Sequence, residues 1–169
     1  MAGKKIMKAN KAGELLEISL GFEQNARELY RKWSELFAGV PDVAAFWSEY
    51  ASDEAVHARL LEELRARLTP QQLATPIENE MVGDTKRLLT YLQREQNIED
   101  LEQAFHFANM IETSEINPLF EVIMKTFEPD EKAFTLLRSQ LNEHIGKLTY
   151  KFPKRFSSPE LRQAVKVQP

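Results

Sequence analysis

The sequence contains no cysteine among its 169 residues. This absence excludes disulfide bonds, zinc sites built on cysteine, and iron–sulfur or rubredoxin-type iron centres, because all of them need the cysteine sulfur. A chain without cysteine fits a reducing compartment. Lysines near the first residue are not followed by the apolar stretch of a secretory signal. We therefore expect a cytoplasmic protein.

Long apolar runs and an excess of basic residues are also missing. Because no run of about 18 apolar residues occurs, we expect no membrane span. The net charge of −4 gives no electrostatic reason to expect nucleic acid as a partner. Basic residues gather at 4–11 and 147–155, toward the two ends, and we interpret both stretches as solvated. The remaining composition, 43% hydrophobic and 28% charged, is that of an ordinary globular domain.

Helical periodicity is the strongest pattern that is present. Apolar residues recur at gaps of three and four, which keeps one face of a helix buried. Four segments show it: Leu16–Phe37, Val43–Leu68, Leu101–Val122 and Phe134–Leu148. Pro41 suits the first turn of the second helix, Asn97 is a candidate N-cap of the third, and Pro118 predicts a kink within it. No period-two alternation indicates a strand.

The connections between these segments predict the topology. Short turns near Gly39 and Pro129 make two antiparallel hairpins. Residues 70–97 are long enough to cross the length of a bundle, and they carry one small helix that Gly83 and Asp84 could cap. Two hairpins joined by one long crossover are the ferritin-like arrangement.

We therefore predict an all-α fold, a ferritin-like four-helix bundle over residues 1–152. The remaining residues, 153–169, form a C-terminal tail in which 159–167 could make a short helix.

Charged side chains interrupt the apolar stripes near the middle of the helices. Burying an unpaired charge costs several kcal/mol even after the structure relaxes. A pair of divalent metal ions would compensate so many inward carboxylates and imidazoles. The candidate ligands are Glu23, Glu54, His57, Glu112, Glu115 and His144.

The spacing of these residues favours a carboxylate-bridged metal site. Glu54 and His57 form Glu-x-x-His, which places both side chains on adjacent turns of one face. Carboxylate-rich sites with imidazole suit iron or manganese. Di-iron bundles take one glutamate from each of two helices and a Glu-x-x-His motif from each of the other two. Glu23 and Glu112 fit the lone glutamates.

The second Glu-x-x-His motif is incomplete. Leu141 stands three residues before His144, where the pattern requires glutamate, and Glu115 could supply the missing oxygen ligand. We therefore expect two iron ions, or one if Leu141 prevents the second from binding, with manganese or zinc as substitutes.

Four segments resemble the rubrerythrin family of the ferritin-like superfamily: Phe22–Tyr30, Asp53–Arg59, Phe107–Glu115 and Glu143–Ile145. The resemblance implies a non-haem di-iron site that reacts with hydrogen peroxide or dioxygen, and a homodimer. It implies as ligands Glu23, Glu54, His57, Glu112 and His144, with Glu115 as an extra carboxylate. The four-cysteine rubredoxin domain of many rubrerythrins is absent, so electrons would come from an external donor.

Two other functions stay open. A degenerate bundle could bind metal or act as a scaffold without catalysis, and a subunit of this length could store iron.

The aromatic residues at 30, 33, 47 and 50 are expected to pack in the core. An aromatic side chain beside an oxidising iron centre could also relay electrons. His106 falls beside the stripe and is expected to be structural or exposed.

Overall fold

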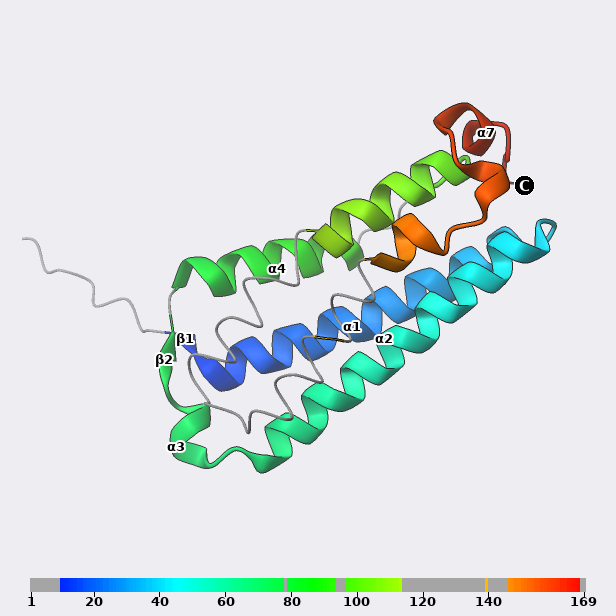
Figure 1. Ribbon diagram of the computed structural model, residues 1–169. Coiled ribbons are helices and arrows are strands. Elements are labelled where there is room, and N and C mark those ends of the chain that lie inside the picture. Colours follow the sequence, from blue (N-terminus) through cyan, green and yellow to red (C-terminus); the bar gives the residue numbers. More distant parts are fainter. Residues whose placement is uncertain (1–9, 78, 94–96, 114–138, 140–145, 168–169) are drawn as a thin grey trace, which may run out of the picture.

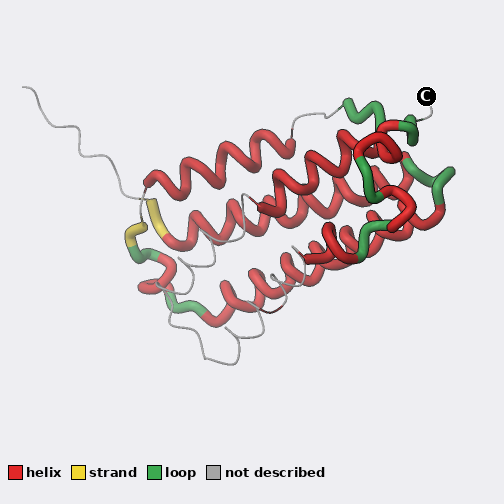
Figure 2. The backbone as a smooth tube through the Cα atoms, turned by 45° about the horizontal axis from the view of Figure 1, so that its top comes forward, coloured by secondary structure: helices red, strands yellow, loops and turns green. Residues whose placement is uncertain are grey.

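The computed structural model describes residues 10–77, 79–93, 97–113, 139 and 146–167. Helices dominate this part of the chain (Figures 1 and 2). Several predictions concern positions outside the described residues: Glu115, Pro118, the turn at Glu128–Pro129, Leu141 and His144. No helix among the described residues is both long enough and apolar enough to cross a membrane.

Helices α1 (Ala12–Leu36) and α2 (Pro41–Arg67) form the first hairpin. The two helices run side by side in opposite directions (Figure 1). Pro41 begins α2, where its missing N–H removes no helical hydrogen bond. The N–H of Val43 donates to the carbonyl of Val40 at 2.9 Å, which continues the turn into the helix. The predicted hairpin is confirmed.

The crossover contains α3 (Pro70–Leu73) and α4 (Asn79–Gln93). Thr69 caps α3 through a reciprocal pair of hydrogen bonds with Gln72. The prediction that Gly83 and Asp84 cap a small helix is wrong, because both lie inside α4. Asp84 instead pairs with Arg87 one turn later on the same helix.

A two-residue strand pair was not predicted. Strand β1 (Asn10–Lys11) pairs antiparallel with β2 (Pro76–Ile77), so the crossover is tied to the start of α1. The N–H of Ala12 also donates to the carbonyl of Thr75 at 2.9 Å. Two residues are too few to show the alternation by which strands are recognised in a sequence.

The third long helix begins at residue 101, with helical residues 101–113 described. Its N-cap is Asp100 rather than the predicted Asn97: Asp100 Oδ1 accepts a hydrogen bond from the N–H of Gln103 at 2.9 Å. Asp100 Oδ2 also accepts from Lys166 Nζ at 2.9 Å. This tertiary contact holds the capping side chain, and it cannot be read from the local sequence.

The C-terminal residues pack back on this helix start. After η1 (Lys154–Phe156), the short helix α7 (Pro159–Gln163) confirms the expected helical turn. Hydrogen bonds of 3.0 Å then join the N–H of Leu101 to the carbonyl of Val165, and the N–H of Val167 to the carbonyl of Glu99.

The interpretation of residues 147–155 as a solvated end is wrong for Lys147, whereas Arg155 is exposed as expected. Lys147 is only 7% exposed, and its ammonium pairs with Asp53 and with Glu49 Oε1, the latter at 2.7 Å. Arg155 Nε donates to Asp42 Oδ2 at 2.8 Å. Their carboxylate partners lie on α2, far away in sequence.

The core has an aliphatic and an aromatic part. Ala12, Leu15, Leu16, Ile18, Leu61 and Val82 form the aliphatic cluster. The aromatic cluster contains the rings at positions 30, 33, 47 and 50, as predicted. On α2 the buried Glu54 and His57 come between these two clusters, and on α1 Glu23 directly follows Phe22 of the aromatic cluster.

Asp100→Ala is expected to lower the free energy of unfolding at pH 7 by about 0.5–2 kcal/mol, the usual effect of losing an N-cap. Asp100→Asn should cost less, because its amide oxygen can still accept from the N–H of Gln103. Chemical denaturation of both variants, with the exposed Glu62→Ala as control, measures the difference.

The effect of Asp100→Ala should depend on pH. Burial disfavours ionisation of Asp100, but hydrogen bonds from Lys166 and Gln103 outweigh it and hold the pKa of this carboxyl below its ordinary value. The ionised side chain therefore stabilises the fold above the ordinary carboxyl pKa of about 3.9, and this contribution is lost as the pH falls through the lower folded value. A cost for Asp100→Ala that is the same at pH 3 and pH 7 would contradict this assignment.

Candidate metal centre

Three of the predicted ligands meet inside the first hairpin. Glu23 lies on α1, on the buried face that also carries Ser19 and Ala26. Glu54 and His57 lie on the buried face of α2, adjacent to each other by one turn. The three side chains are 3–5% exposed, so the inward direction predicted from the apolar stripes is confirmed.

The three side chains are close enough to share one ion. His57 Nδ1 is 3.0 Å from Glu54 Oε2 and 3.5 Å from Glu23 Oε2. One potential ligand atom from each residue lies within 4.8 Å of the other two. Within the described residues, this is the group of acidic and histidine side chains that could hold a metal ion.

Within the described residues, the two buried carboxylates of this group share one positively charged neighbour, the imidazole of His57. Burial raises the pKa of Glu23 well above its ordinary value, and the neighbouring Glu54 carboxylate raises it further. Burial alone would lower the pKa of His57, but hydrogen bonds to Glu23 and Glu54 raise it to about 10. A proton on His57 therefore compensates the carboxylates where a divalent cation could do so instead.

Glu112 is brought to the same region by the helix at 101–113, and it is 3% exposed. Its Oε1 accepts a hydrogen bond of 2.5 Å from the hydroxyl of Tyr30. Burial raises the pKa of both Tyr30 and Tyr50, and the negative charges of Glu112 and Glu54 raise it further. Both carboxylates therefore act on the same two phenols, although Glu112 is outside the three-residue group.

Two contacts around the centre were missed from the sequence. Tyr30 was expected to pack in the core, and its hydroxyl bond to Glu112, which joins positions 82 residues apart, was not predicted. Lys147 was expected in solvent, but it pairs with Asp53, the neighbour of Glu54. The one available signal was that Tyr30 shares the buried stripe of Glu23, two helical turns away.

The remaining predicted ligands, Glu115 and His144, lie outside the described residues. Helical residues 146–150 follow His144, and their Lys147 is held on α2 next to Glu54. His106 is exposed, as expected of a residue outside the site.

The described side chains fit a divalent transition metal. Two carboxylates and one imidazole are ligands that iron, manganese and zinc accept, and no thiolate competes with them. Packing these groups together in a dry core without a cation is costly, since replacement of buried ion pairs by apolar residues is often neutral or stabilising. The donor set and the raised pKa of Glu23 therefore agree with a metal centre.

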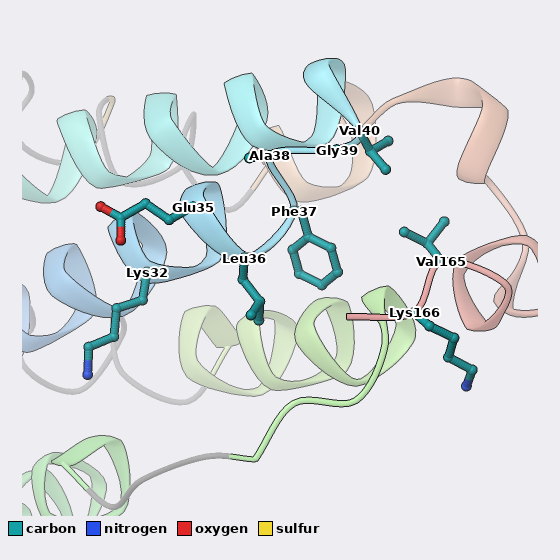
Figure 3. A pocket seen from close by; sticks show the side chains of 9 residues that line it. All are labelled: Lys32, Glu35, Leu36, Phe37, Ala38, Gly39, Val40, Val165 and Lys166. Atoms are coloured by element: carbon teal, nitrogen blue, oxygen red, sulfur yellow. The ribbon is translucent and has the colours of Figure 1, made fainter. Parts of the chain in front are cut away.

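A separate pocket of about 550 Å³ lies near the α1–α2 turn (Figure 3). Phe37 and Val40 of that turn line it together with Val165 and Lys166 from the C-terminal segment. Neither Glu23, Glu54, His57 nor Glu112 lines this pocket, so it does not give access to the centre.

Comparison with a known structure confirms the class of fold. The crystal structure of a ferritin-like diiron-carboxylate protein from Thermotoga maritima superposes with a TM-score of 0.65 and 20% sequence identity. The likeness covers 89% of this chain and 98% of that one. This similarity confirms the ferritin-like helical bundle.

The chain belongs to the rubrerythrin family, because the model of that family matches residues 14–156. No curated protein sequence is significantly similar to it. Family membership and the buried group of Glu23, Glu54 and His57 together support a metal-binding protein of the di-iron type.

Metal binding at pH 7 is expected to release a proton, because the pKa of His57 is about 10 and the imidazole must lose its proton to become a ligand. Titration calorimetry with Zn(II) in two buffers of different ionisation heat measures this release. His57→Gln should reduce this release, leaving any proton that Glu23 gives up, and weaken binding by at least ~10–100-fold, the range seen when even second-layer partners of ligands are removed.

The exposed His106→Gln provides the matched control and should behave as the unsubstituted protein. Equal proton release from the His57→Gln protein would show that His57 is not the group that exchanges a proton for the metal.

Proposed function

We propose that this protein is a non-haem di-iron oxidoreductase that reduces hydrogen peroxide, or dioxygen, with electrons from an external donor. The observation that carries the proposal is the buried Glu23–Glu54–His57 group in a member of the rubrerythrin family. The three side chains are buried, close together and chemically suited to iron.

In this proposal the chain's own residues bind the metal and shield it. Glu23, Glu54 and His57 hold one iron, and Glu112 serves the second together with Glu115 and His144. Bound Fe(II) supplies the electrons that cleave the O–O bond of peroxide. Tyr30 orients the Glu112 carboxylate through its hydroxyl, and the surrounding aromatic rings exclude water.

An external electron donor follows from the composition. The chain has no cysteine, so it cannot hold a thiolate-bound iron that would return electrons to the centre. The proposed cycle therefore depends on a separate reductant. We also propose a homodimer in the cytoplasm, as the family resemblance and the lack of cysteine led us to expect.

A second candidate function is a metal-binding module with one ion and no redox turnover. The specific observation that favours it is Leu141 in place of the second motif's glutamate. A single metal ion would make two-electron reduction of peroxide difficult, and the bundle would then bind or buffer metal. Iron storage would require a large assembly, which size-exclusion chromatography would reveal.

Loading with Fe(II) under anaerobic conditions is expected to place two irons on each chain, measured by elemental analysis of the desalted protein. Peroxide should then oxidise them rapidly, at one peroxide for two Fe(II), and give the absorption of an oxo-bridged diferric centre. Glu54→Ala should prevent loading, whereas the exposed Glu62→Ala on the same helix should not.

Leu141→Glu separates the two candidate functions. One iron in the unsubstituted protein, rising to two in the Leu141→Glu protein, would contradict the di-iron oxidoreductase and favour the one-metal module. No iron in either protein would overturn both.

A further inference from the structure

Aromatic side chains form a continuous path that starts at the metal centre. The Tyr30 hydroxyl donates a hydrogen bond to Glu112, so its ring is linked directly to the carboxylate that the proposed function assigns to the second iron. The ring of Tyr30 contacts Trp33 edge to face, with 5.5 Å between the ring centroids. Both side chains are at most 2% exposed. The path therefore begins among fully buried side chains of the core.

The path continues to the surface of the crossover. Trp33 contacts Phe107 at 5.9 Å, and Phe107 stacks on Tyr91 at 5.2 Å with an angle of 16° between the rings. Tyr91 lies on α4 and is 39% exposed. Three segments, α1, residues 101–113 and α4, thus supply one ring after another from Glu112 to solvent.

The order of ring types along the path is suited to single-electron transfer. Phenol and indole rings lose one electron more readily than a benzene ring, so Tyr30, Trp33 and Tyr91 can each hold an oxidised state for a short time. Phe107 cannot do so easily, but it closes the gap between Trp33 and Tyr91 with rings in contact on both sides.

A second branch of the same cluster lacks this order. From Trp47 the ring contacts lead to Phe152 at 6.0 Å, and from Phe152 to Phe105 at 4.8 Å. Phe105 then lies under the guanidinium of Arg162, 4.1 Å from the ring centroid. Along this branch the two rings after Trp47 are phenylalanine, so it ends without a readily oxidised ring.

We propose that Tyr30, Trp33 and Tyr91, bridged by Phe107, carry single electrons between the metal centre and the surface of α4. Tyr91 is then the point at which a one-electron donor delivers electrons to the protein. This inference rests on the proposed reduction of peroxide, and it supplies the entry route that a chain without cysteine lacks.

The electrons and protons of this transfer balance. Tyr30 gives an electron toward the centre while its phenolic proton moves to Glu112 Oε1, and Glu112 returns that proton when Trp33 gives Tyr30 an electron. Tyr91 then gives an electron to Trp33, and the donor gives one to Tyr91. Two such transfers, with two protons taken up from water, reduce one peroxide to two waters. Without a donor, two Tyr91 side chains on separate chains each lose an electron and a proton. Their rings then join by a carbon–carbon bond as dityrosine, and one peroxide becomes two waters.

The first test needs no metal. Because the chain has no cysteine, Arg87→Cys creates one attachment site for a ruthenium photosensitiser, one turn before Tyr91 on α4. Flash oxidation of the label should produce the transient absorption of a tryptophan radical, since both tryptophans of the chain lie in the buried cluster. Tyr91→Phe and Phe107→Leu are each expected to abolish this signal.

Tyr150→Phe is the matched control. Tyr150 is 81% exposed, and no ring contact links it to the cluster in the described part of the chain. Its substitution should leave the tryptophan radical unchanged. A radical signal of equal size and rate in the Tyr91→Phe and Phe107→Leu proteins, with far-UV circular dichroism confirming that both are folded, would overturn the proposed path.

The second test uses the iron-loaded protein with peroxide and no donor. Dityrosine at position 91, identified by peptide mass spectrometry, is expected in the unsubstituted and Tyr150→Phe proteins and should be lost in Tyr91→Phe. Peroxide consumption with dityrosine unchanged in the Tyr91→Phe protein would overturn the path and leave the proposed function intact. A tryptophan radical that depends on Tyr91, in a protein that consumes no peroxide, would support the path and overturn the proposed function.

Discussion

Burial of acidic groups in an apolar bundle is the constraint on which the rest of this structure depends. Glu23, Glu54 and Glu112 are each less than 5% exposed, and a carboxylate in such surroundings must find a proton, a donor or a cation. Protonated His57 compensates the charge of Glu23 and Glu54, and the hydroxyl of Tyr30 donates a hydrogen bond to Glu112. The contacts of His57 with Glu23 and of Tyr30 with Glu112 each join two helices, so these polar groups tie the helices together.

The same constraint explains why the core has an aliphatic part and an aromatic part. On the side of α1 that leads to its first residues, small and branched aliphatic side chains such as Leu15 and Leu61 fill the bundle. On the other side, Tyr30 and Tyr50 provide large apolar rings that also carry a hydroxyl close to the acidic groups. Rings with a polar end can face a charged centre with one edge and the apolar core with the other.

The sequence was sufficient to predict what depends on local periodicity. The α1–α2 hairpin, the start of α2 at Pro41 and the inward direction of Glu23, Glu54 and His57 all follow from spacings of three and four residues. The buried position of Lys147 was not predictable in this way. Its partners stand about 95 residues earlier on another helix, and only tertiary packing brings them together.

Capping shows the same division between local and tertiary causes. Both Asn97 and Asp100 have side chains that can cap a helix, and intrinsic preference does not separate them. Asp100 differs from Asn97 in its contact with Lys166, which the C-terminal residues bring beside it. A sequence pattern can therefore name the candidates for a helix start, while a contact from the end of the chain distinguishes them.

The crossover has a physical role beyond connecting two hairpins. Helix α4 packs along α1, and Lys86 Nζ pairs with Glu14 at 2.6 Å near the start of that helix. Tyr91, farther along α4, meets Phe107 of the third helix instead. A short loop would leave this side of the bundle open to water, and Phe107 would lack the ring that stacks on it there. The long crossover thus closes the core around the acidic centre. It also places the half-exposed phenol of Tyr91 in ring contact with Phe107, so that one element both shields the core and links it to the surface.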